Sequence, residues 1–446
     1  TLFKEIQQHE PGTAAVITKS GLRTWSYFQP RYQPDSSIKT IEDAADLLRP
    51  TLESTIINRT VSDVPLAVLL SGGIDSSAVA AIVAANSIRP IKTFNVRFED
   101  QTYDESPIAR EVAQHIGAEH HEITIPNAGF SEEHLSRIVD HVGQPFHDSS
   151  AIPTYLVSEE VQKHVKVCLS GDGGDEMFAG YPIYDWAATV RKLGQLPNTM
   201  LKMVPPALKF AGKFAPASFG EPIRQAERAF AAASKSDQDQ LSEIMSLFLA
   251  SEVGDLITDS DTKTSAEGSL SALTDLPDEA SEWSGLRRTM YTLLTKSLPA
   301  DMLVKTDRMS MASSLELRSP FLGNDIADIS FKMPDKFLRA NKTGKLVLRQ
   351  SVKDILPESV FTHPKSGFSI PLHSFQNAEY VAAAHNLLRP SSAIYELLDE
   401  PTVANIKERG LSNASGAAVI SQYRASHQLW SLMQLATWLE RFNVAI

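Results

Sequence analysis

The sequence contains very little cysteine. Cys168 is the single cysteine among 446 residues, so no disulfide can form within the chain, and zinc sites built from several thiolates are excluded. A chain without disulfides fits a reducing compartment. We therefore expect a cytoplasmic protein.

Long apolar runs and an excess of positive charge are also missing. The longest uninterrupted run of small apolar residues, residues 78–85, is far shorter than the ~20 residues that cross a bilayer as a helix, so no membrane partner is expected. The formal net charge of −12 argues against a nucleic-acid carrier, because such proteins bind phosphates mainly through Lys and Arg. A local basic patch stays open, since net charge does not describe its distribution.

The size and composition are those of a globular protein with several packed units. Hydrophobic residues make up 42% of the chain and charged residues 22%, which is ordinary for globular domains. A chain of 446 residues is too long for one ordinary core, so two or three units are expected.

Apolar runs alternate with helical patterns in the first half of the chain. Strands are expected over residues 65–70, 91–98, 121–125 and 165–169, with helices between them. This alternation predicts an α/β fold with a doubly wound parallel sheet, in which ligands bind at the carboxyl ends of the strands. Helical patterns dominate beyond Asp185, and residues 258–284, rich in Ser, Thr and acids, predict an exposed linker.

The first of two glycine-rich loops, residues 71–77 (SGGIDSS), connects a buried strand to a helix. Its glycines allow a tight turn that brings backbone N–H groups to an anion, and the helix N-terminus adds further N–H groups. Three serine hydroxyls are additional donors, and Asp75 is a suitable ligand for Mg²⁺ that bridges phosphates. The Gly-Lys-Ser/Thr of kinases and GTPases does not occur in this loop. The alternative is an ordinary glycine turn with a serine N-cap.

The second loop, residues 170–176 (SGDGGDE), also follows a strand directly. Its three acids repel one another unless a cation lies among them. Taken alone, such a loop is equally well explained as a solvated turn. Because both loops follow strands that end at one edge of the sheet, we expect Asp75 and Asp175 to share Mg²⁺ beside a nucleotide.

Four motifs, in their order along the chain, resemble the synthetase domain of the asparagine synthetase family. Besides the two loops they are residues 318–322 (RSPFL) and 365–368 (KSGF). The resemblance runs over essentially the whole chain. It implies the PP-loop ATP pyrophosphatase fold with a helical C-terminal lobe, and ATP and Mg²⁺ as cofactors.

The resemblance also implies roles for individual residues. Lys365 would stabilise the charge that develops as a carboxylate attacks the α-phosphate of ATP; without the family match it would be an ordinary loop lysine. Asp172 would meet the substrate amine or the intermediate, and adenine would lie near Leu69 and Val96. The residues expected to contact ATP or pyrophosphate are Leu69, Leu70, Ser71, Gly72, Gly73, Asp75, Ser76, Ser77, Val96, Ser170 and Gly171.

Several further charged residues are candidates for contact with the carboxylate substrate. They are Asp148, Asp307, Arg308, Glu316 and Arg318. Charges amid apolar residues fit a buried ion-pair network equally well. Asp148 could instead cap a helix.

Four regions are expected along the chain. Residues 1–46 resemble the closing segment of a glutaminase domain with a linker, 47–195 the ATP-binding α/β core, 196–285 a helical insertion with a mobile linker, and 286–446 the helical C-terminal part. Complete family members begin with a glutaminase domain whose N-terminal cysteine liberates ammonia, a role that Cys168 cannot take. We therefore expect a glutaminase domain or subunit beyond these residues to supply ammonia. A homodimer is also possible.

The expected reaction joins aspartate and ammonia at the expense of ATP and yields asparagine, AMP and pyrophosphate. One alternative is a relative that acts on another carboxylate, such as a sugar uronate, a peptide side chain or a β-lactam precursor. A non-catalytic nucleotide-binding module is the alternative of another class, disfavoured by the presence of Asp75, Asp175 and Lys365. A PP-loop ligase that modifies tRNA is disfavoured by the acidic charge.

Overall fold

A computed structural model describes residues 2–3, 5–98, 104–125, 130–212, 217–248, 250–259, 276–363, 372, 376–412 and 419–444. At its centre lies a five-stranded sheet of order β5-β4-β3-β6-β7, in which all neighbours run parallel. The strands are β3 (Leu66–Leu69), β4 (Lys92–Phe98), β5 (Glu119–Ile125), β6 (Val167–Leu169) and β7 (Glu316–Arg318). The predicted parallel α/β sheet is confirmed, and β7 is an edge strand that the sequence patterns do not predict.

The chain enters the sheet at β3 and builds outwards in both directions. Strand β3 pairs with β4 on one side and with β6 on the other. The direction of winding therefore reverses between β3 and β6. Such a reversal opens a crevice at the carboxyl ends of the strands, and both glycine-rich loops lie there.

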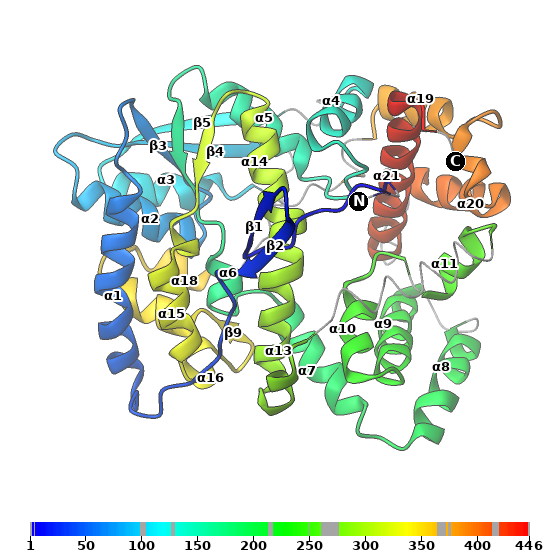
Figure 1. Ribbon diagram of the computed structural model, residues 1–446, viewed down its shortest axis with the longest axis horizontal. Helices are drawn as coiled ribbons and strands as arrows, with labels where there is room; N and C mark the ends of the chain where they lie inside the picture. The colour runs from blue at the N-terminus through cyan, green and yellow to red at the C-terminus, as the bar shows by residue number, and fades with distance from the viewer. Residues whose placement is uncertain are drawn as a thin grey trace.

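Helices cover both faces of this sheet (Figure 1). On one face, α1 (Ile41–Asn58), α2 (Ile74–Ala85) and α3 (Ser106–His115) share one hydrophobic core. Helix α2 is buried almost throughout, because its Ala, Val and Ile side chains are small enough to lie between the sheet and α1. On the other face, α5 (Ala151–Val161) packs through Val157 and Val161 against Phe94.

A long helical rod crosses the middle of the molecule (Figure 1). It consists of α13 (Gly285–Thr292), a π-helical segment (Leu293–Met302) that contains Pro299, and α14 (Leu303–Met311). π-Helical segments inside longer helices are frequent at functional sites. The chain then continues through β7, α15 (Asn324–Lys332), α16 (Asp335–Leu338), the hairpin β8 (Arg339–Ala340) and β9 (Thr343–Gly344), α17 (Leu346–Val352) and α18 (Ser359–Thr362).

The remaining helices build a second core on the right of Figure 1. Helices α4 (Glu132–Val142), α19 (Ala378–Leu387), α20 (Glu400–Leu411) and α21 (Val419–Phe442) enclose the fully buried Trp430. A smaller cluster joins α7 (Ile183–Leu193), α8 (Asn198–Gly212), α9 (Ala217–Ala233) and α10 (Asp237–Met245), and α11 (Ala250–Leu256) packs on α20. Within the part of the chain that is described, no helix combines the length and apolarity needed to span a bilayer. The expected boundaries at residues 46, 195 and 285 stay predictions.

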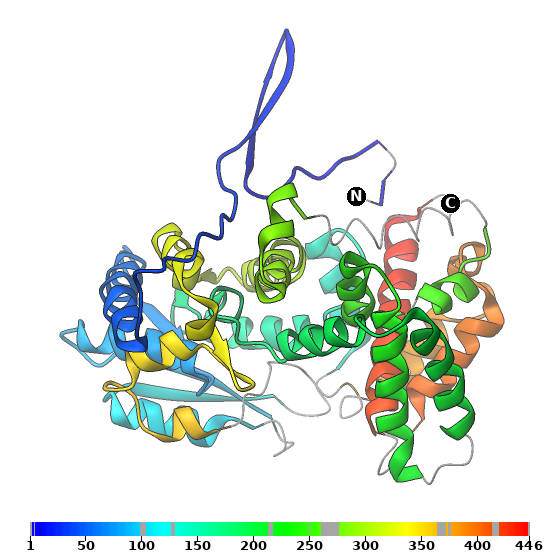
Figure 2. The same ribbon diagram turned by 90° about the horizontal axis from the view of Figure 1, so that it is seen from below.

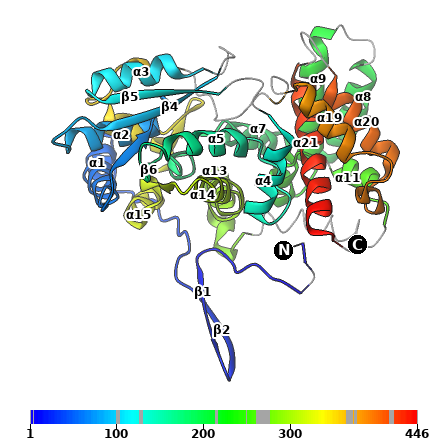
Figure 3. The same cartoon turned by 90° about the horizontal axis from the view of Figure 1, so that it is seen from above.

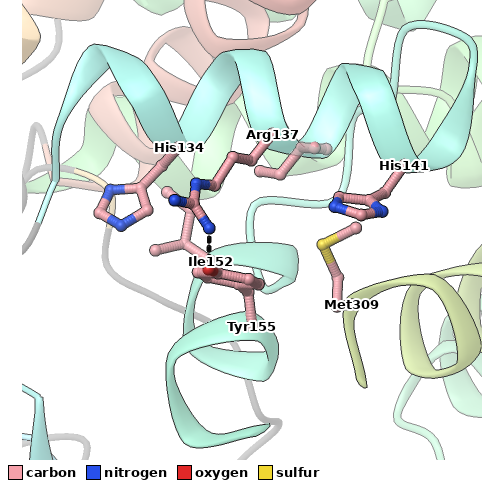
Figure 4. Close-up of a pocket in the computed structure, with 7 residues that line it drawn as sticks. His134, Arg137, His141, Ile152, Tyr155 and Met309 are labelled. Atoms are coloured by element: carbon pink, nitrogen blue, oxygen red, sulfur yellow. Dashed lines mark hydrogen bonds between the residues drawn. The ribbon is translucent and has the colours of Figure 1, made fainter. Parts of the chain in front are cut away.

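Packing around α4 is tight (Figure 4). His134, Arg137 and His141 lie along one side of α4 and meet Tyr155 of α5 and Met309 of α14, with Arg137 donating a hydrogen bond to the Tyr155 hydroxyl. No space for a water molecule is left between these side chains. His134 accepts a hydrogen bond from the Ser131 N–H at the start of α4 (3.0 Å), whereas His141 is exposed near the end of the helix.

The hairpin of β1 (Thr13–Thr18) and β2 (Gly21–Ser26) projects from the body of the molecule (Figures 2 and 3). Both strands are largely exposed, and Ile17 retains 83% of its accessible surface. An isolated two-stranded hairpin is marginally stable at best. Among the described residues, this hairpin presents apolar side chains such as Ile17 and Leu22 that the others leave exposed.

Candidate active site

A cavity of about 590 Å³ lies at the carboxyl ends of β3, β4 and β6, a size that suits a small-molecule ligand. Its wall combines the two glycine-rich loops, the π-helical segment with α14, and the β8–β9 hairpin with the start of α17. The predicted residues that line it are Leu69, Leu70, Ser71, Gly72, Gly73, Asp75, Ser76, Val96, Ser170, Gly171, Asp172 and Asp175. Ser77, also predicted to contact ATP, is completely buried on α2 and is not among the lining residues.

The first glycine-rich loop is held in shape by its own serines. The Ser76 hydroxyl accepts a hydrogen bond from the Ser71 N–H (3.1 Å) and donates one to the Gly73 carbonyl (3.1 Å). Gly73 is the N-cap of α2 and has no side chain to occupy the N–H groups of the first helical turn. Those N–H groups and the positive end of the helix dipole are suited to bind a phosphate.

The second loop lies directly against the first one. A methyl group at Gly171 would stand 2.8 Å from the backbone nitrogen of Ser76, and one at Gly174 would stand 2.5 Å from Asp75 Oδ1. Only glycine fits at such distances. Asp75, in the first turn of α2, and Asp175, in the first turn of α6 (Gly174–Met177), thereby come to one place.

A buried lysine joins these two carboxylates. The ammonium of Lys345 contacts Asp75 Oδ2 and lies 2.7 Å from Asp175 Oδ1, and its side chain is only 6% exposed. Burial by itself would lower the pKa of Lys345, but the charges of Asp75 and Asp175 outweigh it and raise that pKa. Sequence reasoning does not find Lys345, because it belongs to none of the four motifs.

The donor set of the two acids fits Mg²⁺. Both ligands are carboxylates, from two different loops, and the described residues contain no cluster of three or more Asp, Glu, His or Cys that could form a complete protein cage. Mg²⁺ is commonly bound by one or two carboxylates and completed by water and substrate phosphates. Asp75 and Asp175 are therefore suited to a metal ion that arrives with a nucleotide.

The part of the cavity beside the sheet is apolar. Leu69 and Val96 at the strand ends line it together with Val157 of α5, and such a surface suits a flat purine base. Nearby, the Asn95 side-chain amide donates to the Leu70 carbonyl (2.9 Å) and accepts from Ser106 (2.8 Å), which fixes the end of β3.

Asp172 of the second loop and Lys305 of α14 both line the cavity. Asp172 accepts hydrogen bonds from Ser170 (2.8 Å) and Thr306 (3.4 Å). Lys305, 4% exposed, donates to Asp148 (2.9 Å) and Ser150 (2.8 Å). Burial alone would raise the pKa of Asp148, but Lys305 outweighs it and holds that pKa below its usual value.

Asp148 is expected either to belong to a buried ion-pair network or to cap a helix, and its surroundings show features of both. Its carboxylate accepts the Ser150 N–H (2.9 Å) just before α5 and also forms the buried pair with Lys305. Asp148 does not itself line the cavity, whereas Lys305 does.

The other four substrate candidates lie away from the cavity wall. Asp307 and Arg308 are exposed on α14, with 3.8 Å between their charged groups. Glu316 pairs with Arg318 (2.7 Å) at the edge strand β7, and Arg318 also donates to the backbone carbonyls of Arg59 and Val61. Their role in substrate binding stays a prediction to which the cavity adds no support.

Lys365 lies outside the described residues. His363, two positions before it in the sequence, is described and lines the cavity. Like Lys365, the other residues of the 365–368 motif lie outside the described part of the chain.

Glu176 is a second residue of the site whose importance the sequence does not reveal. Its side chain lines the cavity, is 3% exposed and accepts a hydrogen bond from the Tyr181 hydroxyl (2.8 Å). Burial, assisted by the charge of Asp175, raises the pKa of Glu176 to about 7. Its carboxyl group therefore changes protonation near neutral pH.

The sheet reversal, the paired glycine loops and the cavity define an α/β protein with a fold of the ATP pyrophosphatase type. The family model described as "Asparagine synthase" matches residues 47–440. The chain belongs to the asparagine synthase family. The resemblance identified from the four motifs is thus confirmed.

Individual relatives agree with this assignment. The chain is 32% identical over 394 residues to asparagine synthetase [glutamine-hydrolyzing] 1 of Bacillus subtilis (strain 168), covering 88% of this chain and 60% of the relative. It is 30% identical over 420 residues to a putative asparagine synthetase of Mycobacterium tuberculosis (strain H37Rv), covering 90% and 61%. A 26% identical match to amidase chyE of Penicillium rubens covers 83% and 59%. The chain thus spans about three fifths of the length of these relatives.

Proposed function

We propose that this chain activates a carboxylate, preferably that of aspartate, with ATP and transfers ammonia to it. The observation that carries the proposal is the meeting of two glycine-rich loops around a buried lysine and two carboxylates, at the switch point of a parallel sheet. Family membership supports the ligase class.

The first chemical step would be adenylation. A carboxylate oxygen attacks the α-phosphorus of ATP, the bond from that phosphorus to the oxygen bridging to the β-phosphorus breaks, and pyrophosphate leaves. The N–H groups of the first loop are suited to bind the phosphates, and Lys345 lines the same cavity. Lys365 is proposed to stabilise the charge that develops. Mg²⁺ held by Asp75 and Asp175 would neutralise phosphate charge.

The second step would form the amide. Ammonia attacks the acyl carbon, AMP leaves with the bonding electron pair, and the nitrogen gives up a proton. Asp172 lines the cavity and is oriented by hydrogen bonds from Ser170 and Thr306. It is therefore suited to bind the incoming amine or to receive this proton.

Phosphorus NMR of the reaction mixture tests the proposal. ATP, Mg²⁺, ammonium chloride and aspartate should yield AMP and pyrophosphate in equal amounts, together with asparagine. Formation of ADP and orthophosphate would instead assign the chain to a different class of ligase. Replacing aspartate by glutamate or by a uronic acid in the same assay identifies the carboxylate.

Ammonia is proposed to come from a glutaminase domain or subunit beyond these residues. Cys168, the single cysteine, lies in β6, and burial raises the pKa of its thiol to about 12. A buried thiol of that kind is not a nucleophile at neutral pH. The chain alone should therefore use ammonium salts and release no glutamate from glutamine.

A second candidate is amide formation on a carboxylate other than aspartate. Binding aspartate also requires a cation for its α-carboxylate. Helix α14 contributes Lys305 to the cavity, but this lysine is already paired with Asp148. Leu298 and Met302 make the adjoining wall apolar. The similarity to a relative named as an amidase agrees with this candidate, and the carboxylate screen distinguishes the two.

A further inference from the structure

Lys345 occupies the place between the two carboxylates that the proposed function assigns to the metal. Its ammonium contacts one oxygen of each acid, Asp75 Oδ2 and Asp175 Oδ1. The two acid side chains retain only 15% and 16% of their accessible surface. An oxygen atom that already accepts from an ammonium in a buried site cannot bind a divalent cation equally well.

The backbone holds this lysine in place. Lys345 has a φ of 59°, in the left-handed region, and its N–H donates to the Phe178 carbonyl at 2.8 Å. The preceding turn of the β8–β9 hairpin is also left-handed, with φ of 49° at Asn341 and 64° at Lys342. Residues other than glycine rarely adopt a positive φ, and those that do cluster at functional sites.

Two glycines make room for the same contact. A methyl group at Gly180 would stand 1.8 Å from Asp175 Oδ1 and 2.2 Å from Lys345 Cε, and one at Gly344 would stand 2.2 Å from the Ala179 carbonyl oxygen. The Lys345 side chain therefore passes directly over the backbone of Gly180 to reach the acids. The backbone conformation at Lys345 and the two glycines thus bring the ammonium to the carboxylates.

We propose that Lys345 competes with divalent metal for the Asp75–Asp175 pair, so that metal binds the free protein weakly and binds well only together with phosphates. The inference rests on the assignment of the two acids as metal ligands in the proposed function. Phosphate oxygens that arrive with the metal can accept the displaced ammonium, so the exchange leaves no buried charge without a partner. Lys345 is thus a positioning residue that couples metal binding to nucleotide binding.

The test measures metal binding without any nucleotide. Mn²⁺ is titrated into the full chain, and free Mn²⁺ is followed by electron paramagnetic resonance. Lys345→Met removes the charge and keeps an unbranched side chain, and it should raise the Mn²⁺ affinity about tenfold or more. Adding Asp175→Asn to Lys345→Met should abolish the gain.

Lys342→Met is the matched control. Lys342 lines the same cavity and is exposed on the β8–β9 turn, and among the described residues it forms no ion pair with either acid. Its replacement should change the Mn²⁺ affinity less than about twofold. An equal gain in both variants would show a general charge effect and overturn the proposal, as would equal affinities in Lys345→Met and wild type.

A second measurement covers the case in which Lys345→Met unfolds because two buried carboxylates lose their counter-ion. Millimolar Mg²⁺ should then restore the thermal unfolding transition of the variant and leave that of wild type nearly unchanged. No restoration would also overturn the proposal. Neither measurement includes ATP, so a failure to detect pyrophosphate release would count against the proposed function alone.

Discussion

Replacing Glu176 by glutamine should make the folded protein more stable at alkaline pH than wild type. Glu176 lies on α6 with 3% of its surface exposed, and its pKa is raised from 4.5 to about 7, chiefly by burial. In the unfolded chain the carboxyl titrates near its ordinary value. Between pH 4.5 and 7 the native state therefore binds more protons than the unfolded state, and stability falls as pH rises through this window.

The size of the effect follows from the same pKa. A change from 4.5 to about 7 corresponds to ~3 kcal/mol of unfolding free energy that wild type has at low pH and has lost by about pH 8. The amide that the Glu176→Gln substitution introduces remains neutral throughout and can still accept the hydrogen bond of the Tyr181 hydroxyl. The difference between Glu176→Gln and wild type should therefore grow in favour of the variant by up to roughly 3 kcal/mol.

Urea unfolding at half-unit steps from about pH 4.5 to about pH 8.5 measures this difference. Asp43→Asn is the control, because hydrogen bonds at the N-cap of α1 lower the pKa of Asp43 and place its titration below the window. Its difference from wild type should not vary with pH across the upper part of that range. Parallel stability curves for wild type and Glu176→Gln would refute the assignment of a neutral, buried carboxyl at this position.

Further predictions concern the charged residues of the site. Lys305→Met should destabilise the fold by roughly 3–5 kcal/mol, because it leaves Asp148 buried without its counter-ion; adding Asp148→Asn should recover most of the loss in thermal unfolding, and additive losses would contradict the pairing. Asp75→Ala and Asp175→Ala should each lower pyrophosphate release at limiting Mg·ATP while far-ultraviolet circular dichroism stays native; normal release in both would place the metal elsewhere. Lys365→Ala should lower kcat by on the order of 10²–10³ at saturating ATP, and an effect on ATP affinity alone would make Lys365 a binding residue.

The part of the fold that the sequence predicts is the part in which local patterns and packing agree. An apolar run, a glycine turn and a small-residue helix specify β3, the first loop and α2, because each pattern is complete within about twenty residues. Strand β7 is only three residues long. Such a length contains no measurable periodicity, so its pairing with β6 is decided by tertiary contacts.

In the site, too, residues within local motifs are predicted from the sequence, and residues brought together only by tertiary contacts are not. The acids and glycines of the loops lie in motifs and are predicted, whereas Lys345 meets Asp75 from 270 positions away and no local pattern indicates that contact. Lys305 could have been found: Met302, Lys305 and Met309 share one side of the rod by helical spacing, and Met309 is buried. Asp307 and Arg308 lie on the same helix and are exposed.

Because Cys168 is buried, the rate at which its thiol reacts with a reagent can report how often the sheet opens. Its thiol lies in β6, between β3 and the edge strand β7, and is wholly inaccessible in the folded state. Thiol reagents can modify it only when the central sheet separates, so the rate of labelling under native conditions reports that opening. A reporter cysteine placed on the surface could be labelled selectively in the same chain, because the native thiol would not compete until the protein unfolds.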